Sequence, residues 1–200
     1  MLKRYGFFGS IRLMISLIYT KMFFPKARII RLPFDIRNKH LAEIGKGFTT
    51  GFGCRIESVP VNSNATNCIR IGDNVQINDY VHIAAGESIT IGNNVLIASR
   101  VFISDLNHGA YSGDHHDSPL TPPNDRKLST NRVVICDNVW IGEAVCIMSG
   151  VTVGAGSIIG ASSVVTKDVP PNSIAVGSPA KVVKVYNFEN AIWERINNSN

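Results

Sequence analysis

The sequence lacks a cysteine motif, a membrane-spanning apolar run and a secretion signal. Its 200 residues contain four scattered cysteines: Cys54, Cys68, Cys136 and Cys146. No two of them form a C-x-x-C pair, which argues against disulfides or metal binding and indicates a reducing cytoplasm. Arg12 and Lys21 interrupt the apolar N-terminal segment, so no uncharged run approaches the roughly 18 to 20 residues that span a bilayer. These charges, and the lack of a small-residue cleavage site, also argue against a signal peptide.

Acidic residues are nearly missing from the N-terminal fifth of the chain. Residues 1–40 hold nine Lys or Arg against one Asp, a net charge of +8, whereas the whole chain carries +5. We predict an amphipathic helix from Tyr5 to Phe24, ended by Pro25. Two interpretations stay open: the helix packs on the first coils, or residues 1–31 contact anionic lipid at the inner face of the cytoplasmic membrane. No basic stripe with interleaved aromatics follows, so nucleic acid is not an expected partner.

What the sequence does have is a six-residue repeat. Aliphatic anchors recur through most of the chain, and nine of the eleven intervals between them are six. This period is neither the 3.6 of a helix nor the 2 of an ordinary strand. It fits short strands joined by tight turns, three to a triangular coil, with each anchor pointing to the axis and stacking on another roughly eighteen residues away. The anchors are Ile71, Ile77, Ile83, Ile91, Ile97, Ile103, Ile135, Ile141, Ile147, Val153, Ile159 and Val165.

Three stretches carry a family resemblance: IGNNVLIASRVFI, NVWIGEAVCIMSGVTVGAGSIIGASSVVTKDVPP and GSPAKVVK. They resemble the hexapeptide-repeat acyltransferases, most of all the O-acetyltransferases of bacterial lipopolysaccharide, O-antigen and capsule synthesis and the galactoside and maltose acetyltransferases. The resemblance implies an all-β, left-handed parallel β-helix that forms a homotrimer with active sites between subunits. It also implies direct transfer of acetyl from acetyl-CoA to a hydroxyl of a sugar or lipid-linked glycan, with no metal.

The expected organisation is one domain with two short extensions. Residues 1–43 form the helix and its lead-in, residues 44–184 the β-helix, and residues 185–200 a tail with a short helix. The repeat stops at Ile103 and should resume in phase at residues 133–135. Residues 104–134 are therefore predicted to protrude as a loop.

The protruding loop contains the candidate catalytic base, His108. Acetyl transfer to a hydroxyl requires a base that takes the proton as the oxygen attacks the thioester, and a neutral imidazole suits that role near pH 7. In the resembling family the base is a histidine at the start of this loop, where His108 stands. His115 and His116 lie further along the loop and are candidates for contact with substrate.

A second group is expected to fix the orientation of the imidazole. Asp105, three residues before His108, is one candidate. Asn78 is the other, because it stands where the galactoside acetyltransferase pattern has an asparagine facing the catalytic histidine. Its alternative interpretation is a turn residue at a corner of a coil.

The last repeats are expected to bind CoA. Small residues would let the pantetheine arm lie against the backbone, whose N–H groups would bind its carbonyls or the developing oxyanion. A tryptophan would line the acetyl channel or fill a corner between coils. Lysines would bind the phosphates or, equally, solubilise the terminal coil. The candidates are Trp140, Gly142, Gly160, Ala161, Thr166, Lys167, Lys181 and Lys184.

Other functions fit parts of the pattern. A γ-type carbonic anhydrase shares the fold and binds zinc through three histidines, which His82, His108 and His115 or His116 could supply, but their spacing and the GSPAK ending argue against it. A non-catalytic β-helix subunit would need neither His108 nor the terminal glycines and lysines. Xenobiotic and serine acetyltransferases stay open within the enzyme class, although the latter carry a long helical N-terminal domain that 43 residues cannot supply.

Overall fold

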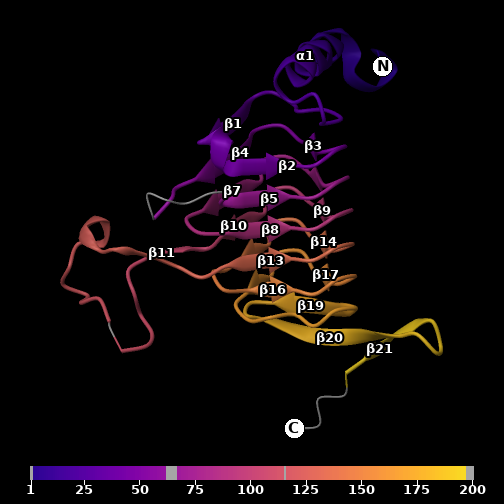
Figure 1. Cartoon of the computed structure of the whole chain (residues 1–200). Helices are drawn as coiled ribbons and strands as arrows, with labels where there is room; N and C mark the ends of the chain where they lie inside the picture. Colours follow the sequence, from indigo (N-terminus) through magenta and orange to yellow (C-terminus); the bar gives the residue numbers. More distant parts are fainter. Residues whose placement is uncertain (1, 62–66, 115, 197–200) are drawn as a thin grey trace.

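The structure is a triangular stack of short strands with a helix across one end (Figure 1). It is a computed structural model and describes residues 2–61, 67–114 and 116–196. Helix α1 (Leu2–Phe23) precedes the strands, which form three mainly parallel sheets. From β2 onward the chain passes from the first sheet to the second and the third and then begins the next coil.

The strands are distributed over the three sheets as follows. The first sheet contains β2 (Ala42–Ile44), β5 (Ile69–Ile71), β8 (Ile89–Ile91), β13 (Val133–Ile135) and β16 (Thr152–Val153). The second contains β3 (Thr49–Thr50), β6 (Gln76–Ile77), β9 (Leu96–Ile97), β14 (Trp140–Ile141), β17 (Ile158–Ile159), β19 (Ser173–Gly177), β20 (Ala180–Asn187) and β21 (Ile192–Arg195). The third contains β1 (Phe34–Arg37), β4 (Cys54–Ser58), β7 (His82–Ala85), β10 (Phe102–Ser104), β15 (Cys146–Ile147) and β18 (Val164–Val165). Short 3₁₀ turns cover Lys39–Leu41 and Pro123–Asp125.

The hexad anchors form the core of the stack. Neighbouring coils are in register, so Ile77 lies beside Ile97, and Ile97 beside Ile141. Every one of the predicted anchors is at most 3 % exposed, and burying an aliphatic side chain of this size contributes roughly 1.5 to 3 kcal/mol. The predicted repeat, its three-strand coil and its axial aliphatic column are therefore confirmed.

Tight turns between the sheets use a residue in the left-handed conformation three positions after an anchor. After strands of the first sheet this residue is Asn74, Asn94 or Asn138, with φ of 57°, 56° and 59°. Asparagine adopts this conformation at lower cost than most other residues that carry a side chain. The chain can therefore change direction at each corner without lengthening the six-residue repeat.

A hairpin interrupts the stack between β10 and β13, as expected. Strands β11 (Leu106–His108) and β12 (Leu128–Thr130) pair antiparallel with each other, and the rest of the excursion projects sideways from the stack (Figure 1). The coil resumes at β13, where Val133 pairs with Ile89 and Ile135 with Ile91. The prediction that the β-helix returns in phase at residues 133–135 is confirmed.

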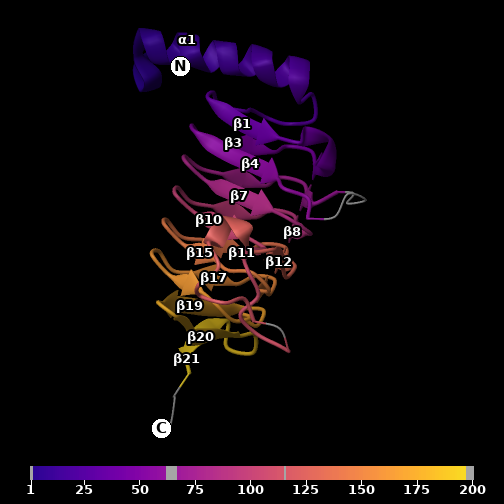
Figure 2. The same cartoon turned by 90° about the vertical axis from the view of Figure 1, so that its left-hand side faces the viewer.

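Helix α1 lies across the N-terminal end of the stack (Figure 2), and its orientation corrects the predicted amphipathic arrangement. Its bounds are close to those predicted, with a break at Gly6. The side turned to the coils carries hydroxyl groups: Thr20 accepts a hydrogen bond from the Ile30 N–H (2.8 Å), and Ser16 accepts one from the Leu32 N–H (3.2 Å). Many of its aliphatic and aromatic side chains face solvent instead. The helix packs on the first coils through these hydroxyl groups and through Tyr19, which packs against the core.

Two predicted boundaries are wrong. The β-helix begins before residue 44, because β1 pairs with β4 and Ile29 bridges Thr49. The tail does not contain the predicted short helix in its described part, residues 185–196, because β20 continues to Asn187 and β21 returns antiparallel to it. These pairings join segments that the local sequence cannot relate to each other.

The four thiol groups differ in burial. Cys54 and Cys68 are buried, and Cys136 and Cys146 are half-buried. Burial raises the pKa of the Cys54 thiol to about 11, so this side chain stays protonated near neutral pH. Within the described residues, no helix is long and apolar enough to cross a membrane.

Candidate active site

The strand order places the candidate residues at two different corners of the stack. The Asn78 corner joins the second sheet to the third; it comprises residues 78–81, 98–101, 142–145 and 160–163. The His108 corner joins the third sheet to the first; it comprises residues 105–132, 148–151 and 166–168. Within one subunit, the width of the third sheet separates these two corners.

His108 ends strand β11, where the loop leaves the His108 corner. It pairs with Leu128 across the hairpin, and its backbone carbonyl accepts a hydrogen bond from the Tyr111 hydroxyl. The side chain is exposed, and no described residue of the subunit hydrogen-bonds to its ring. A rigid strand therefore holds an imidazole whose two ring nitrogens are both available to other groups.

Asp105 does not orient His108 within the subunit, and this expectation is corrected. The residue is 0 % exposed, and its carboxylate accepts hydrogen bonds from three successive backbone N–H groups, those of Gly86 (2.6 Å), Glu87 (2.9 Å) and Ser88 (2.7 Å). Both carboxylate oxygens are used in this way. Asp105 therefore fixes the base of the loop to the coil before it.

Asn78, the other candidate orienting group, follows β6 at the Asn78 corner. It is half-buried, and its side-chain oxygen accepts a hydrogen bond from Gln76 Nε2 (3.1 Å). The structure does not bring Asn78 to His108 within one subunit, because the two residues lie at different corners. Their direct contact therefore requires a second copy of the chain.

The small CoA candidates lie at the Asn78 corner, next to Trp140. The tryptophan opens β14 and is 50 % exposed. Gly142 is buried, and a Cβ there would lie 2.6 Å from the Ala161 nitrogen, so close packing of the two coils accounts for this glycine and its expected contact with CoA is not supported. At Gly160 a Cβ would approach Val176 Cγ1 to 2.7 Å. Ala161 is exposed at the same corner.

The remaining CoA candidates lie elsewhere in the subunit. Thr166 and Lys167 follow β18 and are exposed at the His108 corner. Lys181 and Lys184 lie on β20; the first is exposed and the second half-buried. Among the described residues, no carboxylate forms an ion pair with any of these lysines. Their charges are therefore available to an anionic ligand.

The third sheet carries a cluster of charged side chains around one buried carboxylate, which the sequence analysis does not predict. Glu57 is 7 % exposed; its Oε2 accepts hydrogen bonds from Arg55 (2.6 Å) and Arg37 (3.1 Å), and its Oε1 lies 2.9 Å from His82 Nε2. Burial alone would raise the pKa of this carboxyl, but the hydrogen bonds and charges of His82 and Arg55 outweigh it and lower the pKa. The four residues come from three strands, and Glu57 precedes the clear hexads, so no local pattern signals the cluster.

The loop borders an open hollow of about 560 Å³. His116 is among its lining residues, and its Nε2 lies 3.0 Å from the Gly113 carbonyl, which can only accept a hydrogen bond. Asp117, also on the wall, accepts a hydrogen bond from the Ala110 N–H (2.7 Å). His115 lies outside the described residues. The hollow therefore combines an apolar lining, which includes Ala110 and Leu128, with a few charged and hydrogen-bonding groups.

The γ-type carbonic anhydrase alternative requires three histidines that converge on a zinc ion. Among the described residues, no group of three His, Cys, Asp or Glu side chains could hold a metal ion. His82 is the first residue of β7, and its Nε2 faces Glu57. The loop that holds His108 leaves the third sheet at the other end of the strands, after β10. The two described histidines of that proposed triad therefore do not converge.

Comparison with known proteins gives the class of the chain. Residues 132–167 match the family model described as "Bacterial transferase hexapeptide (six repeats)". The chain is 44 % identical, over 96 % of both chains, to "Putative lipopolysaccharide biosynthesis O-acetyl transferase WbbJ" of Escherichia coli. It is 34 % identical to the galactoside O-acetyltransferase of Escherichia coli, covering 78 % of this chain and 76 % of that protein.

Solved structures agree with the sequence comparison. The hexapeptide-repeat acetyltransferase VCA0836 of Vibrio cholerae superposes with a TM-score of 0.58 at 31 % identity, over 74 % of this chain and 77 % of that one. The N-acyltransferase AntD of Bacillus cereus superposes with a TM-score of 0.65 over 82 % and 84 %, and its 23 % identity supports the fold alone. The chain belongs to the hexapeptide-repeat acyltransferases, and its stack of coils is the left-handed parallel β-helix of that family. It is accordingly an enzyme of the acyltransferase class.

Proposed function

We propose that this protein transfers acetyl from acetyl-CoA to a sugar hydroxyl of a bacterial surface polysaccharide, either lipopolysaccharide O-antigen or capsule. The observation that carries the proposal is His108, an exposed imidazole on a short strand directly after a β-helix coil, at the start of a polar loop. The similarity to the lipopolysaccharide and galactoside O-acetyltransferases supports a carbohydrate hydroxyl as acceptor.

His108 is the general base in this reaction. Its neutral imidazole takes the proton of the sugar hydroxyl while the oxygen attacks the thioester carbonyl of acetyl-CoA. The carbon–sulfur bond then breaks, and the thiolate of CoA leaves with a proton from the imidazolium. The transfer is direct, because among the described residues no cysteine or serine side chain is hydrogen-bonded to a histidine that could activate it.

Acceptor and donor occupy different parts of the protein. The open hollow of the loop suits a sugar, because His116 and Asp117 on its wall can bind hydroxyls and its apolar lining can contact the sugar ring. The last coils hold the CoA: Trp140 and Ala161 contact its acetyl and pantetheine end, and Lys167, Lys181 and Lys184 bind its phosphates. Thr166 lies beside Lys167 and adds a hydroxyl donor.

The active protein is a homotrimer with three shared sites. The His108 corner of one subunit meets the Asn78 corner of its neighbour, which is the arrangement that allows Asn78 to orient the imidazole. The neighbour also supplies much of the CoA groove. The protein acts in the cytoplasm, where acetyl-CoA is made, on a sugar or a lipid-linked glycan.

Substitution of the base tests the proposal. His108→Ala should lower kcat by about 10²- to 10⁴-fold, the range for a lost general base, with trimer and CoA affinity unchanged. His40→Ala removes an exposed histidine from the turn between β1 and β2, outside the hairpin that holds His108, and serves as the matched control. Activity is measured as CoA release with the purified glycan, and the product by mass spectrometry. Nearly full activity of the His108→Ala variant would refute the assignment.

A further inference from the structure

Helix α1 exposes an apolar face on the side that points away from the coils. Seven of its apolar side chains are 51 to 80 % exposed, and all of them except Phe23 lie on this face. Residues 7, 11, 14, 15, 18 and 22 follow the three- and four-residue spacing of a single helix face. We call this surface the outer face of α1. Its most exposed members are Phe7, Phe8, Met14, Ile15, Ile18 and Met22.

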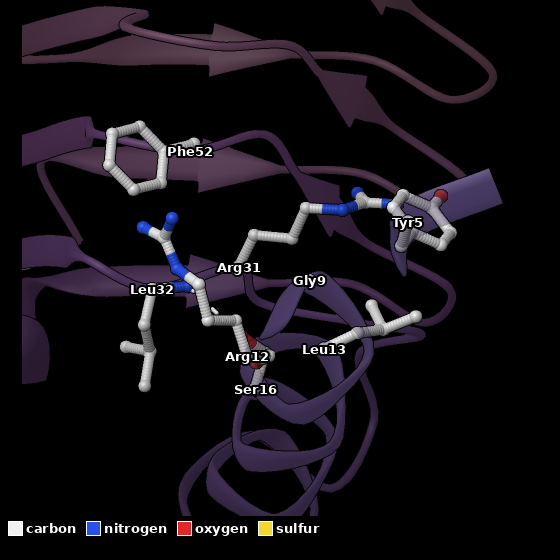
Figure 3. Close-up of a pocket in the computed structure, with 8 residues that line it drawn as sticks. All are labelled: Tyr5, Gly9, Arg12, Leu13, Ser16, Arg31, Leu32 and Phe52. Atoms are coloured by element: carbon white, nitrogen blue, oxygen red, sulfur yellow. Dashed lines mark hydrogen bonds between the residues drawn. The ribbon is translucent and has the colours of Figure 1, made fainter. Parts of the chain in front are cut away.

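The helix cannot turn this face inward without losing its contacts to the coils. Thr20 is fully buried and Ser16 nearly so, and both hydroxyls accept backbone N–H groups of the segment that follows the helix. Arg12 places its guanidinium over the Phe52 ring of the first coil, 5.1 Å from the ring centre (Figure 3). Arg31 donates to the Thr50 carbonyl (2.8 Å) beneath the helix. The orientation of α1 is therefore fixed by its polar side.

We propose that the outer face of α1 binds the surface of a bilayer that contains anionic lipid, with the helix lying in the plane of the interface. The helix crosses the end of the stack, so its outer face forms the end of the molecule and projects beyond the coils (Figure 2). A helix with apolar side chains on the exposed side and cations at its margins inserts at the boundary of headgroups and acyl chains.

The positive charge around α1 favours an anionic bilayer over a second copy of the chain as the partner of the outer face. Residues 1–40 carry a net +8, and Lys21, Lys26 and Arg28 are exposed on α1 or directly after it. Two copies that met through α1 would bring two such segments together, which like-charge repulsion opposes. Anionic headgroups attract them, at about 1 kcal/mol for each cation near the surface.

The geometry of a trimer would strengthen the contact. If three subunits assemble with their stacks side by side, all three copies of α1 lie at the same end. Three weak contacts then act together, and the second and third become effectively intramolecular. This gain rests on the proposed trimer, whereas binding through a single outer face does not.

Vesicle flotation with the full-length protein tests the inference. We expect binding to phosphatidylglycerol-containing vesicles, weaker binding at high salt, and little binding to pure phosphatidylcholine. Ile15→Gln/Ile18→Gln should reduce the binding by about tenfold or more, because two inserted aliphatic side chains are lost. Leu120→Gln/Phe188→Gln, two exposed apolar residues far from α1, is the matched control and should bind like wild type.

Failure of the wild type to float with anionic vesicles would overturn the inference. Equal binding to both lipid compositions would do the same, as would an unchanged Ile15→Gln/Ile18→Gln variant. A change in oligomeric state of that variant without lipid would show that a second copy covers the face, which also refutes the bilayer. Thermal unfolding verifies that the variants are folded. The assay contains neither acetyl-CoA nor acceptor, so its outcome is independent of the proposed reaction.

Discussion

Glu57 is a buried carboxylate of the third sheet, and neighbouring side chains stabilise its negative charge. Its carboxylate has Arg55, Arg37 and His82 as partners, which together satisfy both oxygens. A buried carboxylate without such partners would be strongly destabilising. The pKa of Glu57 is lowered in the folded protein despite its burial. The charged form therefore contributes to stability above the ordinary pKa of 4.5 and loses this contribution as the pH falls through the lower folded-state value.

The pH dependence of stability should report this residue. At neutral pH, Glu57→Gln should lower the free energy of unfolding by about 1 to 3 kcal/mol, because charge-assisted hydrogen bonds are lost. As the pH falls from 4.5 through the lowered pKa of Glu57, the wild type should lose the same contribution, so the two proteins converge at acidic pH. Urea unfolding at neutral and at acidic pH measures the difference. Glu43→Gln, an exposed residue 4.0 Å from Arg70, is the control and should differ little from wild type at either pH.

At the scale of elements, the sequence predicts the repeating coils of the β-helix but not the orientation of helix α1, which lies outside the repeat. The anchors identify the coils because a six-residue period allows only one direction, toward the axis, for side chains such as Ile77 or Ile141. The orientation of α1 escapes prediction, because an apolar stripe is ordinarily assumed to face the core. Here the end of the stack presents the N–H groups of Ile30 and Leu32, which require acceptors, so hydroxyl groups face it instead.

One buried carboxylate, that of Asp105, fixes the base of the loop to the preceding coil. Its distance from His108 in the sequence did not reveal this structural role. Asp105 stands three residues from His108, yet it binds three N–H groups of residues 86–88. Asp105→Ala leaves these donors without their acceptor and should cost about 2 to 4 kcal/mol of unfolding free energy. Urea unfolding gives the cost, and limited proteolysis should show faster cleavage in the loop.

A matched variant tests whether the loss of stability is specific to Asp105 or follows from removing any acidic side chain of the loop. Asp114 is exposed in the same loop, and its replacement by alanine should change the unfolding free energy by no more than about 0.5 kcal/mol. Equal stabilities of the Asp105→Ala and wild-type proteins would show that the carboxylate does not anchor the loop. Asp105 would then be open again to a role beside His108 in the assembled protein.

At the scale of the whole molecule, the candidate site is incomplete in one subunit. This could be derived from the sequence: counting anchors in threes places Asn78 after a strand of the second sheet and His108 after a strand of the third. The turns after those strands lie at different corners. What counting cannot supply is which corner of a second copy of the chain would face His108 in the proposed trimer. Two residues that act on one substrate from different corners must come from different subunits.

Mixed trimers test this arrangement directly. His108→Ala and Asn78→Ala subunits, coexpressed in equal amounts with different tags, should regain activity that neither has alone. A shared site is intact when a subunit with His108 meets a neighbour with Asn78, which random assembly gives at about a quarter of the interfaces. Activity per site should therefore approach about a quarter of wild type. Coexpressed His108→Ala chains with the two tags are the control and should stay inactive. If the mixture is no more active than the average of its parents, the two residues do not share a site between subunits.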